Sequence, residues 1–363
     1  MKECEPAAMR QAVEKLNPAD GVIRPGSAQT YACNVVRARW YRENLGFDLD
    51  PLIGMIRDGE DVVVDVSAGT GGASEYLLEQ LAGQGKRLGR LVLKDVDIGM
   101  ARGYMQYAMK ALEGFASSTC DGIDYYILKN RGDGTFDKVS GIAGLRADLV
   151  IMANAIHLVP GNQLVSTLQG IFELLKPGGT AIIGSGSVLS AAKPAESVRV
   201  DELFEHVRAR ALSIIRTGVE YIPVREELGR RSGSPRVTER LAQVFPVPPT
   251  LEALLPVFRE VGFEVRTRFH CTRLERDDYR PFIVGVAGYV KAAILPEAIS
   301  DPKLSQDRAL MSDEALMALA RRAYEEVFDS VPGGHFSMWW TSITATRPPS
   351  SSCPGQAGKA GET

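Results

Sequence analysis

The stretch Asp61-Val-Val-Val-Asp65-Val-Ser-Ala-Gly69-Thr-Gly71-Gly-Ala-Ser-Glu75 sets the expectations for the whole chain. Its β-branched run, Val62 to Val64, is typical of a parallel strand that is covered on both faces. The glycines that follow allow a sharp turn and a close approach of the backbone to a ligand. Helical spacing then resumes, so a helix N-terminus with free N–H groups points at the same place. The pattern predicts a nucleotide site.

This turn carries a resemblance to a known family. It reads Asp65-x-Ser67-x-Gly69-x-Gly71, which resembles the first motif of class I S-adenosylmethionine (SAM) dependent methyltransferases, Asp/Glu-x-Gly-x-Gly-x-Gly. Ser67 departs from the motif, because a glycine stands there in the family. The resemblance implies that these four residues contact SAM. A dinucleotide site is the alternative, since Gly69-x-Gly71-x-x-Ser74 approximates G-x-G-x-x-G/A.

A second acidic position follows the next expected strand, Leu91 to Leu93. A carboxylate at the end of that strand suits a ribose, because it accepts hydrogen bonds from both vicinal hydroxyls. We predict that Asp95 has this role, with Asp97 as the alternative. The resemblance implies that Val96 and Met100 lie against the cofactor as well.

Two further expected strands end in polar residues. The segment from Asp124 to Asn130 predicts the third strand, and the resemblance implies that Asn130, or Asp133, meets the adenine. Asp148 and the apolar run after it predict the fourth strand. Its end, Asn154-Ala-Ile-His157, resembles the Asn-Ala-Leu-His stretch of small-molecule methyltransferases. We therefore expect Asn154 at the cofactor.

Histidines supply the candidates for a catalytic base. A neutral imidazole accepts a proton near pH 7, and His157 follows the fourth strand, where ligands bind in open α/β sheets. His270 and His335 are the other candidates, because each lies where a strand is expected to begin or end. In the alternative interpretation His157 only fixes the turn or touches the cofactor.

The segment Leu174-Leu-Lys-Pro-Gly-Gly179 followed by an apolar run predicts a helix end, a tight turn with a glycine at positive φ, and a fifth strand. It also resembles a signature of the same family, at the expected place after the fourth strand. The resemblance covers roughly residues 60–185. Within this family, helices before the first strand cap the active site, which implies that Tyr31 or Trp40 lines the cofactor or substrate cavity.

We predict the following organisation. Residues 1–58 form an N-terminal helical cap, and 59–186 form the SAM-binding core. Residues 187–249 form a helical insertion or lid, with a mobile surface loop from Arg225 to Arg240. The core resumes over 250–346 with a second insertion at about 271–334, and the tail 347–363 is disordered.

Composition excludes several classes of protein. The chain is 45% hydrophobic and 24% charged with a formal net charge of −3, which argues against nucleic-acid binding. Its five cysteines form no C-x-x-C pair, so neither a disulfide framework nor a metal site is expected. No long apolar span is present, which predicts no membrane contact and a cytoplasmic location.

The sequence thus predicts an α/β protein with a Rossmann-like, doubly wound, seven-stranded sheet of the class I methyltransferase type. N-terminal helices cap the sheet and helical insertions form a lid. The predicted activity is methyl transfer from SAM to a small-molecule acceptor, a biosynthetic intermediate, with O-methylation favoured over C- or N-methylation. A fold that uses SAM without transfer (a cyclase or regulatory subunit) and a nicotinamide-dependent oxidoreductase are the alternatives. A homodimer is left open.

Overall fold

The computed structural model describes residues 35, 38–95, 118–127, 144–244, 247–285, 290–291, 293–298 and 310–349. Several residues named above lie outside these ranges, so their predicted roles stay predictions: Tyr31, Val96, Asp97, Met100, Asn130 and Asp133. Most of the predicted N-terminal cap and almost all of the predicted tail lie outside them as well.

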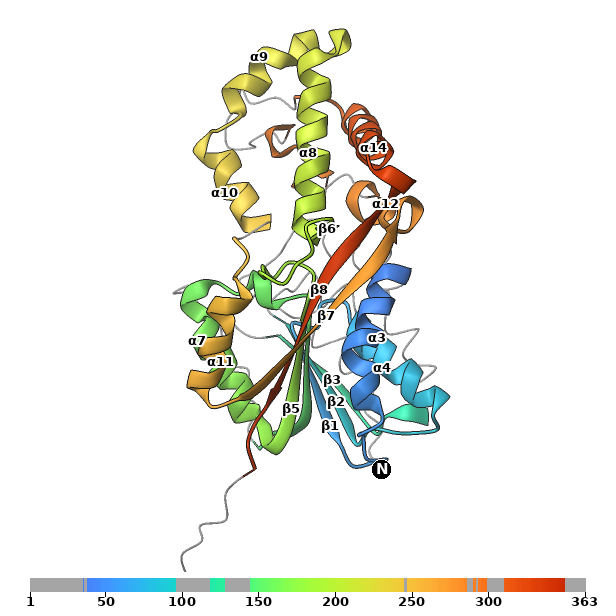
Figure 1. The fold of residues 1–363 in the computed structure, drawn as a ribbon, viewed down its shortest axis with the longest axis vertical. Coiled ribbons are helices and arrows are strands. Elements are labelled where there is room, and N and C mark those ends of the chain that lie inside the picture. Colours follow the sequence, from blue (N-terminus) through green and yellow to red (C-terminus); the bar gives the residue numbers. More distant parts are fainter. Residues whose placement is uncertain are drawn as a thin grey trace, which may run out of the picture.

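A mostly parallel sheet forms the centre of the molecule (Figure 1). Five parallel strands lie in the order β3-β2-β1-β4-β5. They are β1 (Val62–Val66), β2 (Arg90–Asp95), β3 (Ile123–Ile127), β4 (Ala147–Ala153) and β5 (Leu175–Ser185). The sheet continues with β8 (His335–Thr346), antiparallel to β5, and then β7 (Glu264–Glu275), antiparallel to β8. A two-residue strand, β6 (Ser197–Val198), pairs with the beginning of β8.

This strand order confirms the predicted fold class. Chain order reverses between β1 and β4, as in doubly wound sheets, so the carboxyl ends of β1, β2 and β4 meet at a topological switch point. The antiparallel β8 between β5 and β7 distinguishes the sheet from the 3-2-1-4-5-6 order of dinucleotide-binding domains. The seven long strands therefore form a Rossmann-like sheet with an antiparallel edge.

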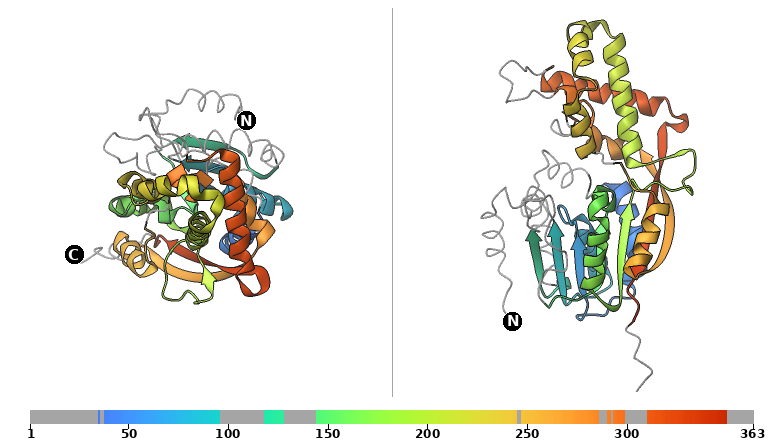
Figure 2. Two further views of the ribbon diagram at one scale, coloured as in Figure 1. Left: turned by 90° about the horizontal axis from the view of Figure 1, so that it is seen from above. Right: turned by 90° about the vertical axis from the view of Figure 1, so that its left-hand side faces the viewer.

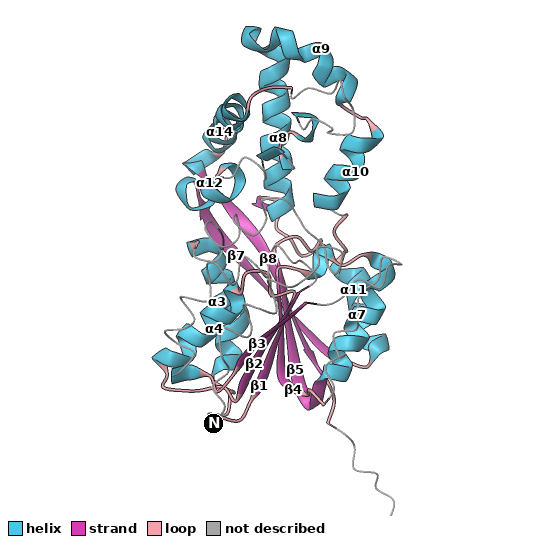
Figure 3. Cartoon of the chain, turned by 180° about the vertical axis from the view of Figure 1, so that it is seen from behind, coloured by secondary structure: helices cyan, strands magenta, loops and turns pink. Residues whose placement is uncertain are grey.

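Helices cover both faces of the sheet (Figures 1 and 3). On one face α3 (Arg39–Ile53) and α4 (Gly72–Gly83) pack against strand residues such as Val63 and Ile182. On the other face α7 (Gly161–Leu174) and α11 (Leu251–Val261) pack against Val64 and Ile183, each of which is the next residue along its strand. Alternate side chains enter opposite cores, which is why the parallel strands read as unbroken apolar runs.

Strands β7 and β8 continue past the sheet as a two-stranded ribbon (Figure 2). Thr341 of β8 pairs with Ser185 at the end of β5, so His335 lies about 20 Å further along the ribbon. Helices α8 (Val200–Thr217), α12 (Arg276–Val284) and α14 (Asp313–Asp329) gather around this extension. We call these helices, together with α9 (Ile222–Arg231) and α10 (Pro235–Val244), the helical extension.

Aromatic side chains join the helical extension to the core. Trp40 of α3 meets Tyr279 and Phe282 of α12 at ring-centroid distances of 5.0 and 5.9 Å. Phe204 of α8 meets Phe282 at 5.3 Å. All four belong to the buried cluster that also contains the α3 face of the sheet. The extension is therefore packed on the core along this side by continuous apolar contact.

The predicted mobile loop from Arg225 to Arg240 is wrong. The structure has two helices there, α9 (Ile222–Arg231) and α10 (Pro235–Val244). Leu228 and Val237 are buried, and the Arg231 guanidinium donates to the Glu297 carbonyl at 3.1 Å. Tertiary burial and these long-range hydrogen bonds outweigh the low local preference of a segment rich in Arg, Gly and Ser. No helix among the described residues is long and apolar enough to cross a membrane.

Candidate functional site

The turn after β1 has a left-handed backbone. Ser67 has φ 59°, Gly69 has φ 57°, and Gly71, the N-cap of α4, has φ 87°. Glycine adopts these angles without a steric penalty, whereas Ser67 carries some strain. No side chain caps the N-terminus of α4. Strand, turn and helix therefore present backbone N–H groups at the carboxyl edge of the sheet, as the sequence predicted.

Neighbouring strands hold this turn in place. Asp95, the last residue of β2, accepts the N–H of Gly69 through Oδ2 at 2.7 Å. Tyr125 of β3 donates its hydroxyl hydrogen to the Gly69 carbonyl at 2.6 Å. The Asp95 carboxyl is thus beside the glycine turn and is only 7% exposed as a residue. This is the position in which we expected a ribose-binding acid.

Asp65 is a buried carboxyl at the end of β1. It is 1% exposed, and Ser74 of α4 donates to its Oδ2 at 2.7 Å. Its Oδ1 has no hydrogen-bond partner among the described residues, and no ion pair there involves it. Burial raises the pKa of Asp65 to about 7, with a further contribution from the charge of Asp95, while the hydrogen bond from Ser74 opposes the rise. An orphaned acceptor at this depth is suited to a donor or a cation that a ligand supplies.

The end of β4 is shaped by a second left-handed residue. Asn154 has φ 52°, and its N–H donates to the Gly184 carbonyl at 2.7 Å. Its Oδ1 accepts the N–H of Gly186 at 3.3 Å. The short 3-10 helix Ile156–Leu158 follows and carries His157, whose Nδ1 lies 3.0 Å from Ser185 Oγ at the end of β5. Asn154 and His157 are therefore fixed at the carboxyl ends of β4 and β5.

The structure does not bring the other candidate histidines to this place. His270 lies on β7, stacks on Phe47 at 4.9 Å, and has its Nε2 3.4 Å from Glu43 on α3. His335 begins β8 far along the ribbon, with its Nδ1 3.0 Å from the Gly333 carbonyl. Only His157 of the three lies beside the ends of the parallel strands. No group of three His, Cys, Asp or Glu side chains suited to a metal is found among the described residues.

Three residues shape the site in ways that were not predicted from the sequence: Ser74, which was named only as the last position of the alternative dinucleotide motif, Tyr125 and Ser185. Ser74 had a local signal, since it lies in the first turn of the expected helix, where a hydroxyl reaches back toward the strand end. Tyr125 and Ser185 had none. Their contacts depend on the register of β3 against β2 and of β5 against β4, which the sequence does not show.

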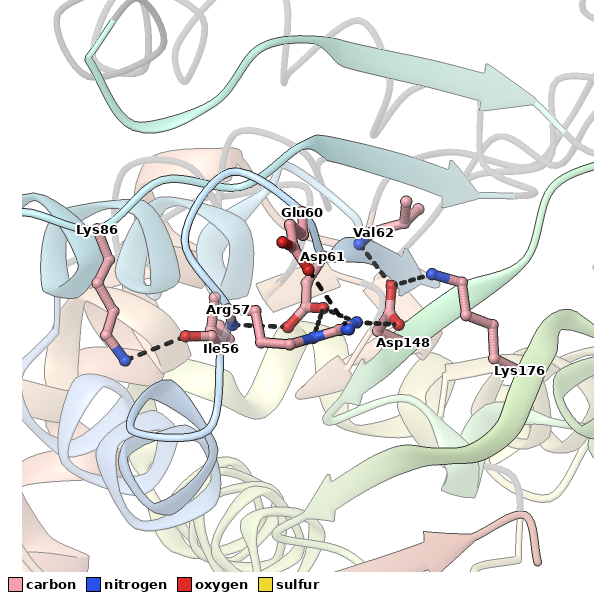
Figure 4. A network of polar contacts seen from close by, with 8 residues as sticks. All are labelled: Ile56, Arg57, Glu60, Asp61, Val62, Lys86, Asp148 and Lys176. Carbon is pink, nitrogen blue, oxygen red and sulfur yellow. Dashed lines mark hydrogen bonds and ion pairs between the residues drawn. The ribbon is translucent and has the colours of Figure 1, made fainter. Parts of the chain in front are cut away.

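The opposite, amino edge of the parallel strands has a dense polar network (Figure 4). Asp148 accepts from Arg57 at 2.9 Å, from Lys176 at 2.7 Å, and from the N–H of Val62 at 2.9 Å. Arg57 also donates to Asp61 at 2.9 Å. Each carboxylate in this network has a cationic partner, so the network ties β1, β4 and β5 together.

Comparison with known proteins gives low similarity. No family model matches the chain. One curated protein, the highly reducing polyketide synthase calA of Penicillium decumbens, is 29% identical over 125 residues. That match covers 34% of this chain, and the chain spans 4% of the length of that protein.

Solved structures resemble the chain at 12–14% identity. A putative sarcosine dimethylglycine methyltransferase from Galdieria sulphuraria has a TM-score of 0.43, with 94% of this chain and 98% of that one covered. Phosphoethanolamine N-methyltransferase 2 of Haemonchus contortus has 0.44, with 89% and 56% covered. The cyclopropane synthase MmaA2 of Mycobacterium tuberculosis has 0.44, with 88% and 90% covered. The fold assignment itself rests on the strand order described above, which is that of a Rossmann-like sheet with an antiparallel edge.

Proposed function

We propose that the protein is a SAM-dependent methyltransferase with a small-molecule acceptor. One observation carries the proposal, namely the left-handed turn from Ser67 to Gly71 with the Asp95 carboxyl bound to its Gly69 amide. It combines a helix N-terminus, a closely approachable backbone and an acid at the end of the adjacent strand. These groups suit a nucleoside with a ribose diol.

The choice of SAM over a nicotinamide dinucleotide is supported by the sheet. The antiparallel β8 is foreign to the all-parallel dinucleotide-binding order. The expected positive φ of a glycine in the Lys176-Pro-Gly-Gly segment is present, since Gly178 has φ 83°, although the segment forms an irregular beginning of β5 and not a separate turn. The residues at the turn also fit the cofactor, because the buried, orphaned Oδ1 of Asp65 can accept from a cationic or donor group.

The chain's own residues have limited chemistry to perform. When bound, SAM supplies an activated methyl group on a sulfonium, and transfer is an in-line displacement. The protein therefore has to bind, orient and exclude water. In our proposal Asp95 binds the ribose, Asp65 and the α4 N-terminus complete the cofactor site, and Asn154 and His157 lie toward the acceptor. The helical extension covers the acceptor side.

The acceptor is proposed as a small biosynthetic intermediate, with O-methylation favoured. The partial match to a polyketide synthase is consistent with such an acceptor. The alternative function is a protein that binds SAM without transferring methyl, as a cyclase or a regulatory subunit. Such a protein would bind SAM at the same site as a methyltransferase, and would differ only in that no methyl group is transferred to an acceptor.

Calorimetry and a methyl-release assay test the proposal in sequence. SAM and S-adenosylhomocysteine should bind to the full chain, and NAD(H) should not. Tighter binding of NAD(H) than of SAM would overturn the cofactor assignment. Methyl release should then occur with at least one member of a panel of phenols, enols and carboxylic acids. SAM binding without release across acceptors of every class would favour the alternative function.

A further inference from the structure

The contact between His157 and Ser185 indicates which nitrogen of the histidine ring carries a hydrogen. Ser185 ends β5 and is 1% exposed. Its Oγ lies 3.0 Å from His157 Nδ1 and also accepts the backbone N–H of Ser187 at 3.1 Å. A serine hydroxyl has one hydrogen and two acceptor lone pairs. The destination of that single hydrogen therefore decides which ring nitrogen of His157 is protonated.

Only one acceptor for this hydrogen is present in the described part of the chain. Of the two atoms within hydrogen-bond distance of Ser185 Oγ, the Ser187 nitrogen is a donor and cannot accept. A buried hydroxyl hydrogen without an acceptor is unfavourable. The hydroxyl of Ser185 must then donate to His157 Nδ1, and an Nδ1 that accepts a hydrogen bond carries no proton.

We propose that Ser185 is a positioning residue that holds neutral His157 in the tautomer with its hydrogen on Nε2. The assignment of the tautomer needs only the contacts above, whereas its consequence for methyl transfer rests on the proposed function. Any group that meets Nε2 must be a hydrogen-bond acceptor. His157 is thus assigned a donor role, where its position in the sequence suggested a base.

The donor role narrows the class of acceptor substrate. A substrate atom that meets the Nε2–H of neutral His157 must accept a hydrogen bond, as the oxygen of a carboxylate, an enolate or a phenolate does. The hydrogen bond favours the anionic form of that group and orients it for in-line attack. An uncharged amine gains nothing from this arrangement, because its lone pair must face the methyl group.

Nitrogen NMR on histidine-¹⁵N-labelled full-length protein tests the tautomer directly. With four histidines in the chain, a His157→Gln spectrum assigns the ring signals. At pH 8 we expect Nδ1 of His157 to be unprotonated and Nε2 to be protonated. Ser185→Ala should give a mixture of the two tautomers, and Ser185→Thr, which keeps the hydroxyl, should restore the wild-type pattern. Ser187→Ala is the matched control and should change nothing, because its contact uses the backbone N–H.

A kinetic arm connects the tautomer to turnover. Ser185→Ala should lower kcat for methyl transfer about 5- to 10-fold, the worth of one neutral hydrogen bond, with KM for SAM unchanged. Ser185→Thr should recover most of the rate. A protonated Nδ1 in the wild type, or an unchanged spectrum in Ser185→Ala, would overturn the inference. The NMR experiment needs neither SAM nor an acceptor, so it tests the tautomer even if the protein proves not to be a methyltransferase.

Discussion

The two edges of the parallel sheet both have aspartates at strand ends, and these aspartates have opposite surroundings. At the amino edge, Asp61 and Asp148 face Arg57 and Lys176 at hydrogen-bond distance. At the carboxyl edge, Asp65 accepts a hydrogen bond from the Ser74 hydroxyl, and no cation among the described residues pairs with it. The same residue type is thus fully satisfied at one edge and left with an orphaned oxygen at the other.

This difference separates stability from function. A carboxylate whose partners are cations of the protein itself stabilises the fold. A buried carboxyl without a charged partner costs stability, and its pKa rises, as the pKa of Asp65 does to about 7. Such groups gather where a ligand completes them. The carboxyl edge therefore carries the proposed cofactor site, while the amino edge holds the strands together.

The largest expected effect comes from the carboxyl edge. His157→Ala removes the donor proposed to face the acceptor, so kcat should fall about 10²–10³-fold, the usual loss for one oriented donor, with SAM affinity nearly intact. Steady-state kinetics and calorimetry measure the two quantities. His206→Ala, on the exposed face of α8, is the control.

Two results would contradict this role. Loss of SAM binding in proportion to activity would show that His157 only supports the cofactor. Full activity would show that methyl transfer uses His270 or His335 in place of His157, or that proximity of the reactants alone suffices.

Asp65 gives a pH-dependent effect of similar size. Burial raises the pKa of Asp65 from its ordinary value of 3.8 to about 7 in the folded state, so the native protein binds the extra proton, and stability falls as pH rises from about 4 to about 7. Asp65→Asn removes this loss. The free energy of unfolding of the variant relative to wild type, without ligand, should therefore increase with pH by up to about 4 kcal/mol. Urea unfolding from pH 4 to 8 measures the difference in unfolding free energy between the variant and the wild type. A difference that does not change with pH would show that the pKa of Asp65 is not raised in the folded protein.

At the amino edge, replacing an aspartate should lower the stability of the protein at neutral pH, where Asp65→Asn at the carboxyl edge should raise it. Asp148→Asn leaves Arg57 and Lys176 without a shared carboxylate, so we expect a loss of about 1–3 kcal/mol in unfolding free energy at pH 7, as for hydrogen bonds to a charged group. Asp124→Asn, which breaks a more exposed pair with Arg90, should cost less than about 1 kcal/mol. Denaturant titration of the two variants side by side provides the check. A smaller loss for Asp148 than for Asp124 would count against the structural role of this edge.

The comparison also explains what could be predicted from the sequence. The turn after β1 and the positive φ of Gly178 depend on interactions within a few residues, and Asp95 lies at a regular strand end, so the sequence pattern predicted their positions. The fold class followed from the order of these units.

The helical extension and the support of the site depend on distant contacts. Helix α9 is stabilised by burial of Leu228 and by hydrogen bonds from Arg225 to the Ile215 and Gly218 carbonyls, although its own sequence favours a loop. Ser185 meets His157 only because β5 lies beside β4 in one register. These contacts join residues that are far apart in the sequence, so no local pattern in a single sequence predicts them.

Calorimetric titration of SAM into a matched pair, Asp95→Ala and Asp148→Ala, tests the functional difference between the edges most directly. Asp95→Ala should weaken binding by about 1.5–3 kcal/mol, or roughly 10- to 150-fold, because it removes the charged hydrogen-bond acceptor that we propose for the ribose. Asp148→Ala should lower the Tm and leave the Kd within about twofold. An unchanged Kd in Asp95→Ala, or equal losses in both folded variants, would contradict a cofactor site at the carboxyl edge built on Asp95.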